Sequence, residues 1–262
     1  ELYDPATESF SNGGDSVSSH GTSSTATLLS DGKGLIVGGN LALSSAEIYD
    51  PETNTFSPTN DLNIGRSGHT ATLLPDGRVL ITGGIDQFSV DAESVAAAEM
   101  FDPDTGSFSL IGNMATSRHG AAATILPSGL VLIVGGRSTE AGSAGETRRA
   151  ELYDPSTESF STTGTLKEWH STGLRWASAP LMANGMVLII GDLSDVAELY
   201  DPSTGEFSRI GSMNSKHFGG TATLLSSGEV LIAGGTMAQG LTEIYDPVAG
   251  TLRISESMGL PR

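Results

Sequence analysis

Arginines, histidines and tryptophans that fall between the apolar segments are the side chains of this sequence best suited to binding chemistry. Both tryptophans lie in one short stretch. An arginine pairs with a carboxylate through two parallel hydrogen bonds and stacks on flat rings. We therefore predict a basic, aromatic-lined binding site for a sugar or an anionic group. Its candidate residues are Arg66, Arg118, Arg137, Arg148, Arg149, Trp169, His170, Arg175, Trp176, His217 and Phe88.

Motifs for catalysis or metal binding are absent from the sequence. Without cysteine, the chain has no thiolate nucleophile, no disulfide and no thiolate metal site. The histidines, at 20, 69, 119, 170 and 217, show no two-histidine metal spacing, and there is no Walker loop or nucleophile elbow. The 31 acidic residues are too many to single out a catalytic pair. We expect no cofactor and no metal, and we favour a non-enzymatic role while leaving enzyme activity open.

The acidic composition limits the partners and the setting. With 13 basic and 31 acidic residues, the formal net charge of -18 repels nucleic acid. Such a charge suits an extracellular or cell-surface setting, with a cytoplasmic one left open. Apolar runs such as Met186 to Ile190 are far shorter than the roughly 18 residues that a membrane span needs. No signal peptide is visible, but a chain that opens at Glu1 could have lost one.

The elements that must position these residues repeat along the chain. The phrase Glu-(Leu/Ile/Met)-(Tyr/Phe)-Asp-Pro occurs six times, with its aromatic residue at positions 3, 49, 101, 153, 200 and 245. The intervals of 46, 52, 52, 47 and 45 residues indicate stacked copies of one supersecondary unit.

The copy at residues 69–110 is the clearest and predicts four short strands. Asp76-Gly77 is a hairpin turn signal, Gly83-Gly84 ends the second strand, and Asp102-Pro103 opens another turn. The expected strands are His69–Leu74, Val79–Thr82, Ala98–Phe101 and Ser107–Leu110. Four strands per copy, regular turn signals and no helical period predict an all-β fold, a β-propeller of four-stranded blades.

These residues also resemble a known repeat. A strand ending in Gly-Gly, a polar stretch, Tyr-Asp-Pro and an aromatic residue seven positions after the Tyr resemble the kelch repeat, in the bacterial form grouped with galactose-oxidase-like propellers. The resemblance covers essentially the whole chain and implies one blade per repeat, with its first strand innermost. Copper oxidases of that group need a Cys–Tyr crosslink, which cannot form here, and the Asp-box of sialidase propellers is absent.

We expect a single domain over residues 1–262, with five complete blades and two strands of another. Residues 1–14 supply the partial blade, and residues 259–262 resemble the approach to a further first strand. We therefore expect both ends to be cut within a blade, which predicts a fragment with an open or poorly closed seam. A closed ring, in which residues 1–10 join the last blade, would refute this. The complete blades are expected at 16–59, 65–110, 116–162, 170–209 and 216–254.

Function is expected on one face of the propeller. Because strands alternate in direction, the Asp-Gly and Asp-Pro turns share one face, and the loops after Gly-Gly share the other with the links between blades. Those loops vary most, at 7, 14, 14, 5 and 7 residues, and variable loops on a rigid scaffold usually carry function. Nine of the 13 basic residues fall there (66, 118, 137, 148, 149, 167, 175, 216, 262).

We therefore predict a non-enzymatic kelch-propeller binding module that takes a protein or carbohydrate ligand on this second face. One alternative is a carbohydrate-active enzyme whose catalytic residues lie on the same loops or in missing blades. Another is a structural repeat of a larger surface protein.

Several repeated residues also have a structural interpretation. Tyr153 and its equivalents are large enough to fill the wedge between blades. The repeated glutamates, at 47, 99, 151, 198 and 243, are expected to bind backbone groups at a blade edge rather than to form a carboxylate ring. Arg66, Arg118, His217 and Arg262 share roughly one repeat position, so bracing neighbouring blades competes with ligand binding for them.

Overall fold

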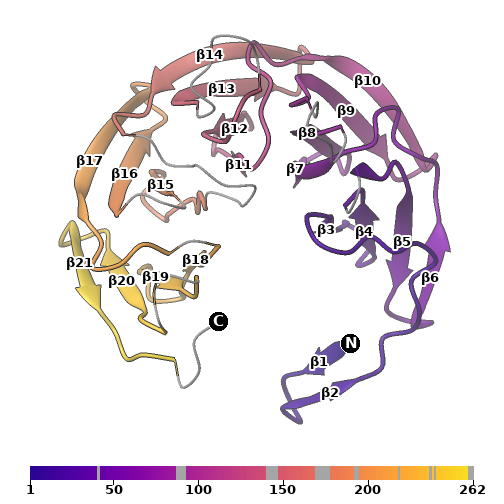
Figure 1. The fold of residues 1–262 in the computed structure, drawn as a ribbon, viewed down its shortest axis with the longest axis horizontal. Helices are drawn as coiled ribbons and strands as arrows, with labels where there is room; N and C mark the ends of the chain where they lie inside the picture. The colour runs from indigo at the N-terminus through magenta and orange to yellow at the C-terminus, as the bar shows by residue number, and fades with distance from the viewer. Residues whose placement is uncertain are drawn as a thin grey trace.

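The computed structural model shows an all-β protein whose sheets follow one another around an open arc (Figure 1). It describes residues 1–39, 42–86, 93–139, 147–168, 178–191, 195–217, 219–235, 238 and 240–258. Within these ranges there is no α-helix, and so none that could cross a membrane. Consecutive strands pair antiparallel in every sheet, so each sheet is built from local hairpins. The prediction of an all-β chain of repeated sheets is confirmed.

Four sheets have the four strands expected of a blade, and we number the blades along the chain. Blade 1 contains β3 (Thr25–Leu28), β4 (Gly34–Val37), β5 (Ala46–Asp50) and β6 (Thr55–Pro58). Blade 2 contains β7 (Ser67–Leu73), β8 (Val79–Ile85), β9 (Ala97–Asp102) and β10 (Ser107–Asn113). Blade 3 contains β11 (Ala122–Ile125), β12 (Val131–Val134), β13 (Arg149–Asp154) and β14 (Ser159–Thr165). Blade 5 contains β18 (Thr221–Leu224), β19 (Val230–Ala233), β20 (Glu243–Asp246) and β21 (Thr251–Ile254).

Blade 4 departs from the predicted four strands. Its sheet has three, β15 (Val187–Ile190), β16 (Val196–Asp201) and β17 (Glu206–Ser212). Ser178 and Leu181 reach β15 only through isolated bridges, to Ile190 and Val187. Pro180 lies between them and has no N–H to donate, so a regular ladder cannot run through this position.

The Asp-Pro turn is the same in every blade, because the aspartate caps it. In each turn the carboxylate accepts the backbone N–H two residues further on, at 2.8–2.9 Å. The aromatic residue before that aspartate then faces the aromatic residue of the next strand. The two ring centroids lie 4.8–5.1 Å apart in each of the five pairs, Tyr3–Phe10, Tyr49–Phe56, Phe101–Phe108, Tyr153–Phe160 and Tyr200–Phe207.

The hydrophobic core is divided into four clusters, one between each pair of neighbouring blades. Tyr153, for example, is fully buried against Leu80 and Met100 of blade 2. A single blade cannot bury both of its faces, so neighbouring blades must cover each other. The predicted role of Tyr153, Tyr200 and Tyr245 as fillers between blades is confirmed.

The arc of blades is not closed. Strands β1 (Leu2–Asp4) and β2 (Ser9–Ser11) form a two-stranded sheet of their own and do not join blade 5 (Figure 1). Tyr3 is 54% exposed and Phe10 69%, although their counterparts in blades 2 to 4 are largely buried. The closed five-bladed ring that would have refuted an open seam is therefore not formed.

Candidate functional site

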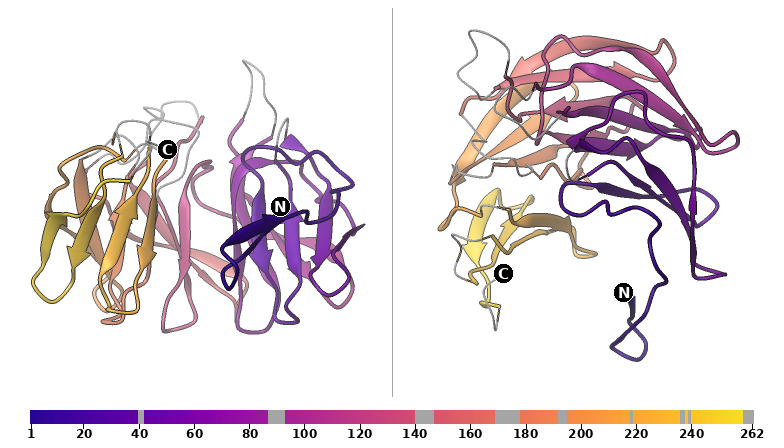
Figure 2. Two further views of the ribbon diagram at one scale, coloured as in Figure 1. Left: turned by 90° about the horizontal axis from the view of Figure 1, so that it is seen from below. Right: turned by 45° about the vertical axis from the view of Figure 1, so that its right-hand side comes forward.

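Two faces of the arc differ in how they are built. The turn face carries the short first-to-second and third-to-fourth strand turns, which line one edge of the molecule in Figure 2, left. The loop face carries the links that lead into each first strand and the loops after Gly-Gly. This alternation follows from the antiparallel strand order.

The repeated glutamate holds the link between blades in place on the loop face. In each blade its carboxylate accepts the N–H groups of two consecutive link residues. The pairs are Val17 and Ser18 on Glu47, Asn63 and Ile64 on Glu99, Ala115 and Thr116 on Glu151, Lys167 and Glu168 on Glu198, and Asn214 and Ser215 on Glu243. The prediction that these glutamates bind backbone groups is confirmed. We call each glutamate with its two link amides a glutamate clamp.

A buried arginine completes the clamp in blades 2 and 3. Nη2 of Arg66 lies 2.6 Å from Oε1 of Glu99, and Nη2 of Arg118 lies 2.6 Å from Oε1 of Glu151. Nη1 of Arg66 donates to the carbonyl of Gly83 at 2.9 Å, and Nη1 of Arg118 donates to that of Gly135 at 3.1 Å. Each arginine thus ties a link to the Gly-Gly end of the second strand.

The surroundings of these arginines assign them to the scaffold. Both side chains are 0% exposed, so a ligand outside the protein has no surface of theirs to contact. Burial lowers the pKa of Arg66, and Glu99 beside it opposes that shift. Arg66 and Glu99 belong to the same blade, so the pair holds a blade to its own link. The interpretation as a brace therefore fits better than direct ligand binding. Each side chain acts within its own blade, while the backbone carbonyls of Arg66 and Arg118 accept the N–H groups of Gly39 and Gly84 in the preceding blades.

Histidine takes the same place in blades 1 and 5. Nε2 of His20 lies 3.0 Å from Oε1 of Glu47, and Nε2 of His217 lies 3.2 Å from Oε1 of Glu243. Both imidazoles are buried. His217, predicted as a binding residue, is therefore also a clamp residue. The equivalent stretch of blade 4 lies outside the described residues, as does Arg262.

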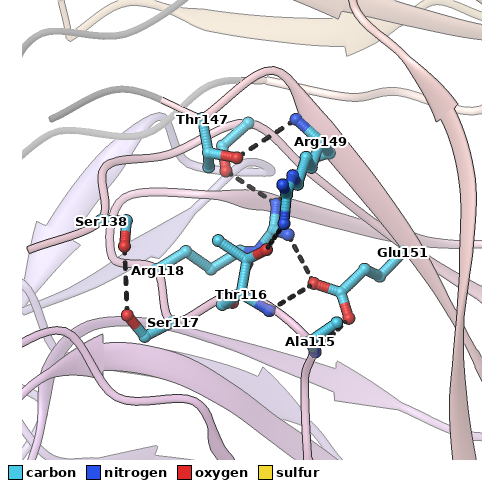
Figure 3. Close-up of polar contacts among 9 residues, drawn as sticks. Ala115, Thr116, Ser117, Arg118, Ser138, Thr147, Arg149 and Glu151 are labelled. Atoms are coloured by element: carbon cyan, nitrogen blue, oxygen red, sulfur yellow. Dashed lines mark hydrogen bonds and ion pairs between the residues drawn. The ribbon is translucent and has the colours of Figure 1, made fainter. Parts of the chain in front are cut away.

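A polar cluster lies above the Arg118 clamp at the loop-face end of blade 3 (Figure 3). Arg149 reaches Thr116 Oγ1 at 3.4 Å, and its backbone N–H donates to Thr147 Oγ1 at 3.2 Å. Oγ of Ser117 lies 3.2 Å from Oγ of Ser138. Arg149 is exposed, whereas the hydroxyl residues beneath it are buried. In this cluster the exposed side chain of Arg149 thus lies over buried hydroxyl groups.

Arg137 and His119 extend this cluster toward blade 2. Their backbones exchange two hydrogen bonds, at 2.9 and 2.8 Å, and Nδ1 of His119 lies 2.8 Å from Oγ of Ser94. Burial, together with the charge of Arg137, lowers the pKa of His119 to about 4, so its imidazole is neutral at pH 7. Arg148 completes the set of three predicted arginines, and it donates to the carbonyl of Lys167 at 3.0 Å.

Of the predicted binding residues, Arg137, Arg148 and Arg149 lie at the loop-face end of blade 3 with side chains that reach solvent. Phe88, Trp169, His170, Arg175 and Trp176 lie outside the described residues. The sequence did not indicate Ser94, Ser117 and Ser138 as residues of this region. A serine is common in any loop, and only the fold shows that these hydroxyls gather beneath the arginines.

Two surface hollows lie on the turn face, opposite the predicted site. One, of about 510 Å³, is lined by Asp31, Asp76, Asp102 and Asp104 among others. The other, of about 470 Å³, lies between the turns of blades 2 and 3. Arg78, in the first hollow, is held by Asp76 and Glu158 at 2.9 Å each. Within the described ranges, no three histidine or carboxylate side chains are placed to hold a metal ion.

Comparison with known proteins adds no family to this picture. No protein-family model and no curated protein sequence matches the chain.

Proposed function

We propose that this chain is a kelch-type, galactose-oxidase-like β-propeller module that binds a protein or carbohydrate ligand on its loop face without catalysing a reaction. The observation that carries the proposal is that Arg137, Arg148 and Arg149 all flank one loop at the loop-face end of blade 3 and reach solvent there. Two of these arginines are half-buried and one is exposed, and buried hydroxyl groups lie among them. In a protein of net charge -18, such a group is a local exception to the surface charge.

The arrangement suits an anionic group on the ligand. A guanidinium donates two parallel hydrogen bonds to a carboxylate, and a half-buried position strengthens such a pair relative to open water. The hydroxyl groups beneath the arginines are held in place, because the contacts of Arg118 and Thr116 with Glu151 fix the link that carries Thr116 and Ser117. A site whose shape is fixed before binding loses less entropy when the ligand arrives. An acidic sugar, or an acidic segment of a protein, is the chemistry that fits.

The repeat supports the kelch assignment within this proposal. In blades 1, 2, 3 and 5, the clamp with its histidine or arginine joins the first glycine after the second strand, the Glu of the third strand and the link before the first strand. The Gly-Gly pair, which is part of the kelch pattern, therefore also takes part in the contacts that hold these blades together. An extracellular or cell-surface setting is part of the same proposal, because acidic glycans and surface proteins are found there.

The proposal is tested by screening the protein against an array of acidic and neutral glycans and by measuring the affinity of each hit. Arg149→Ala should weaken binding by about tenfold or more, since a hydrogen bond to a charged group contributes about 1.5–3 kcal/mol. Arg78→Ala is the matched control, because Arg78 is a partly exposed arginine on the turn face.

Two results would contradict the proposal. If Arg149→Ala and the wild-type protein bind the glycan with equal affinity, the binding site does not lie at Arg149 on blade 3. Loss of binding in Arg78→Ala, with Arg149→Ala unaffected, would move the site to the turn face.

A further inference from the structure

Two buried histidines each lie between two hydrogen-bond acceptors. Nδ1 of His20 is 2.7 Å from the carbonyl oxygen of Gly38, while its Nε2 faces the carboxylate of Glu47 at 3.0 Å. Nδ1 of His217 is 2.9 Å from the carbonyl oxygen of Gly234, while its Nε2 faces Glu243 at 3.2 Å. Both rings therefore bridge a carbonyl and a carboxylate.

This geometry is satisfied by only one protonation state. A neutral imidazole has one N–H and one lone pair, so one of its nitrogens would turn a lone pair toward an oxygen. The imidazolium donates from both nitrogens and binds both oxygens. It then does in blades 1 and 5 what Arg66 and Arg118 do in blades 2 and 3, where a guanidinium bridges the first glycine carbonyl and the glutamate.

The two kinds of cation differ in how they respond to pH. A guanidinium stays charged at every pH that a protein survives, whereas an imidazolium loses its proton in the physiological range. The histidine clamps lie in blades 1 and 5, the two blades that border the open side of the arc (Figure 1). The arginine clamps lie in the interior of the arc.

We propose that blades 1 and 5 are a pH-sensitive pair of end blades. A neutral imidazole at either position donates to only one of its two oxygens and loosens the links at residues 17–18 and 214–215 from Glu47 and Glu243, while the arginine-clamped links of blades 2 and 3 stay closed. The inference concerns the scaffold and does not depend on the ligand proposed above.

The charges around the histidines fix the direction of the effect. Burial is the largest influence on His217 and favours its neutral form, but the hydrogen bonds to Glu243 and Gly234 outweigh it and raise the pKa of His217. A histidine with a raised pKa in the folded state adds stability below its unfolded value near 6.5, and that stability is lost as pH rises through the folded value. The His217 clamp of blade 5 should therefore loosen on the alkaline side.

The partner carboxylates set the acid limit of the same clamps. Burial opposes ionisation of Glu47 and Glu243, yet the link amides and the facing histidine lower the pKa of both. Their contribution is present above pH 4.5 and is lost as pH falls through the lowered folded values. In the part of the chain that the structure describes, Glu47 and Glu243 are the charged groups in contact with the two histidines. The clamp of His217 and Glu243 is therefore strongest in mildly acidic solution.

Amide hydrogen exchange, read by mass spectrometry on the full chain between pH 6 and pH 9, tests the proposal. Protection is corrected for the intrinsic dependence of exchange on pH. Peptides that contain residues 17–18 and 214–215 should lose protection several-fold as pH rises, because one pKa unit corresponds to a tenfold change in an equilibrium constant. Peptides that contain residues 63–64 and 115–116 serve as controls in the same molecule and should not change.

A second experiment replaces the two histidines. His20→Arg and His217→Arg put into the end blades the cation that blades 2 and 3 use, and they should make protection there independent of pH. Protection that falls equally in all four segments would overturn the proposal, as would protection that stays constant in the histidine segments. If an arginine variant fails to fold, the comparison of the four segments in the wild-type protein still decides the question.

Discussion

Replacing Glu151 by glutamine tests whether the clamp supports the loop face. The substitution keeps the size of the side chain and removes its charge. Glu151 accepts from Arg118 at 2.6 Å and from the N–H groups of Ala115 and Thr116 at 2.6 and 3.2 Å. A glutamine has one acceptor oxygen, so at least one of these donors meets an NH₂ group instead.

The cost follows from the burial of the pair. Glu151 is 1% exposed and Arg118 0%, so the arginine is left as an unpaired charge in the interior. Breaking a buried ion pair in this way costs about 3–5 kcal/mol. In a chain of this size each kcal/mol lowers the melting temperature by about 2–4 °C, so we expect a fall of roughly 6–20 °C.

Urea unfolding followed by tryptophan fluorescence and far-UV circular dichroism measures the loss of unfolding free energy. Glu158→Gln is the matched control, because Glu158 pairs with Arg78 at the surface with its side chain 46% exposed. Exposed pairs contribute less than about 1 kcal/mol. If Glu151→Gln unfolds at the urea concentration of Glu158→Gln, the argument for a stabilising clamp fails.

Three further substitutions probe the packing and the buried histidines. Tyr153→Ala should cost about 3–5 kcal/mol in urea unfolding, whereas Tyr3→Ala, at the exposed copy of the same position, should cost far less. Gly83→Ala should lower the melting temperature much more than Gly77→Ala. Both glycines have positive φ, but the added Cβ clashes with the Arg118 carbonyl in the first, whereas its nearest atom in the second lies at 3.7 Å. Burial, then Arg66, lowers the pKa of His69 to about 3, so its contribution to stability is complete above pH 6.5 and is lost as pH falls below that. His69→Gln should therefore reduce the slope of unfolding free energy against pH by about 1.4 kcal/mol per unit between pH 6 and 4, and an unchanged slope would contradict it.

The strands and turns could be predicted because their signals are local. Asp76-Gly77 and Asp102-Pro103 mark turns within a few residues, and the aromatic pair Tyr153–Phe160 spans one hairpin. Blade 4 shows the limit of such signals. Its inner strand was expected by analogy with its neighbours, but Pro180 interrupts the ladder there.

A role of the repeated glutamates in binding backbone groups could be predicted, but their side-chain partners in the clamps could not, because those partners are far apart in sequence. Arg66 and Glu99 are 33 residues apart, whereas His20 and Glu47 are 27 apart, so the two arrangements do not align at a constant spacing. Whether Arg118 faces the ligand or the interior depends on how the link folds over the sheet. For the same reason, the sequence could indicate basic residues on the loop face without showing that Arg66 and Arg118 are enclosed.

The glutamate clamp also defines the boundary between one blade and the next along the chain. The backbone N–H of Leu62 binds Ser44 of blade 1, whereas that of the following residue binds Glu99 of blade 2. The same change of partner falls between residues 114 and 115, 166 and 167, and 213 and 214. A repeat unit that includes its own glutamate clamp therefore starts at these peptide bonds. It does not start at the repeated Glu-(Leu/Ile/Met)-(Tyr/Phe)-Asp-Pro phrase. A blade that is excised or transplanted at those bonds should keep both its glutamate and the two link amides that the glutamate binds.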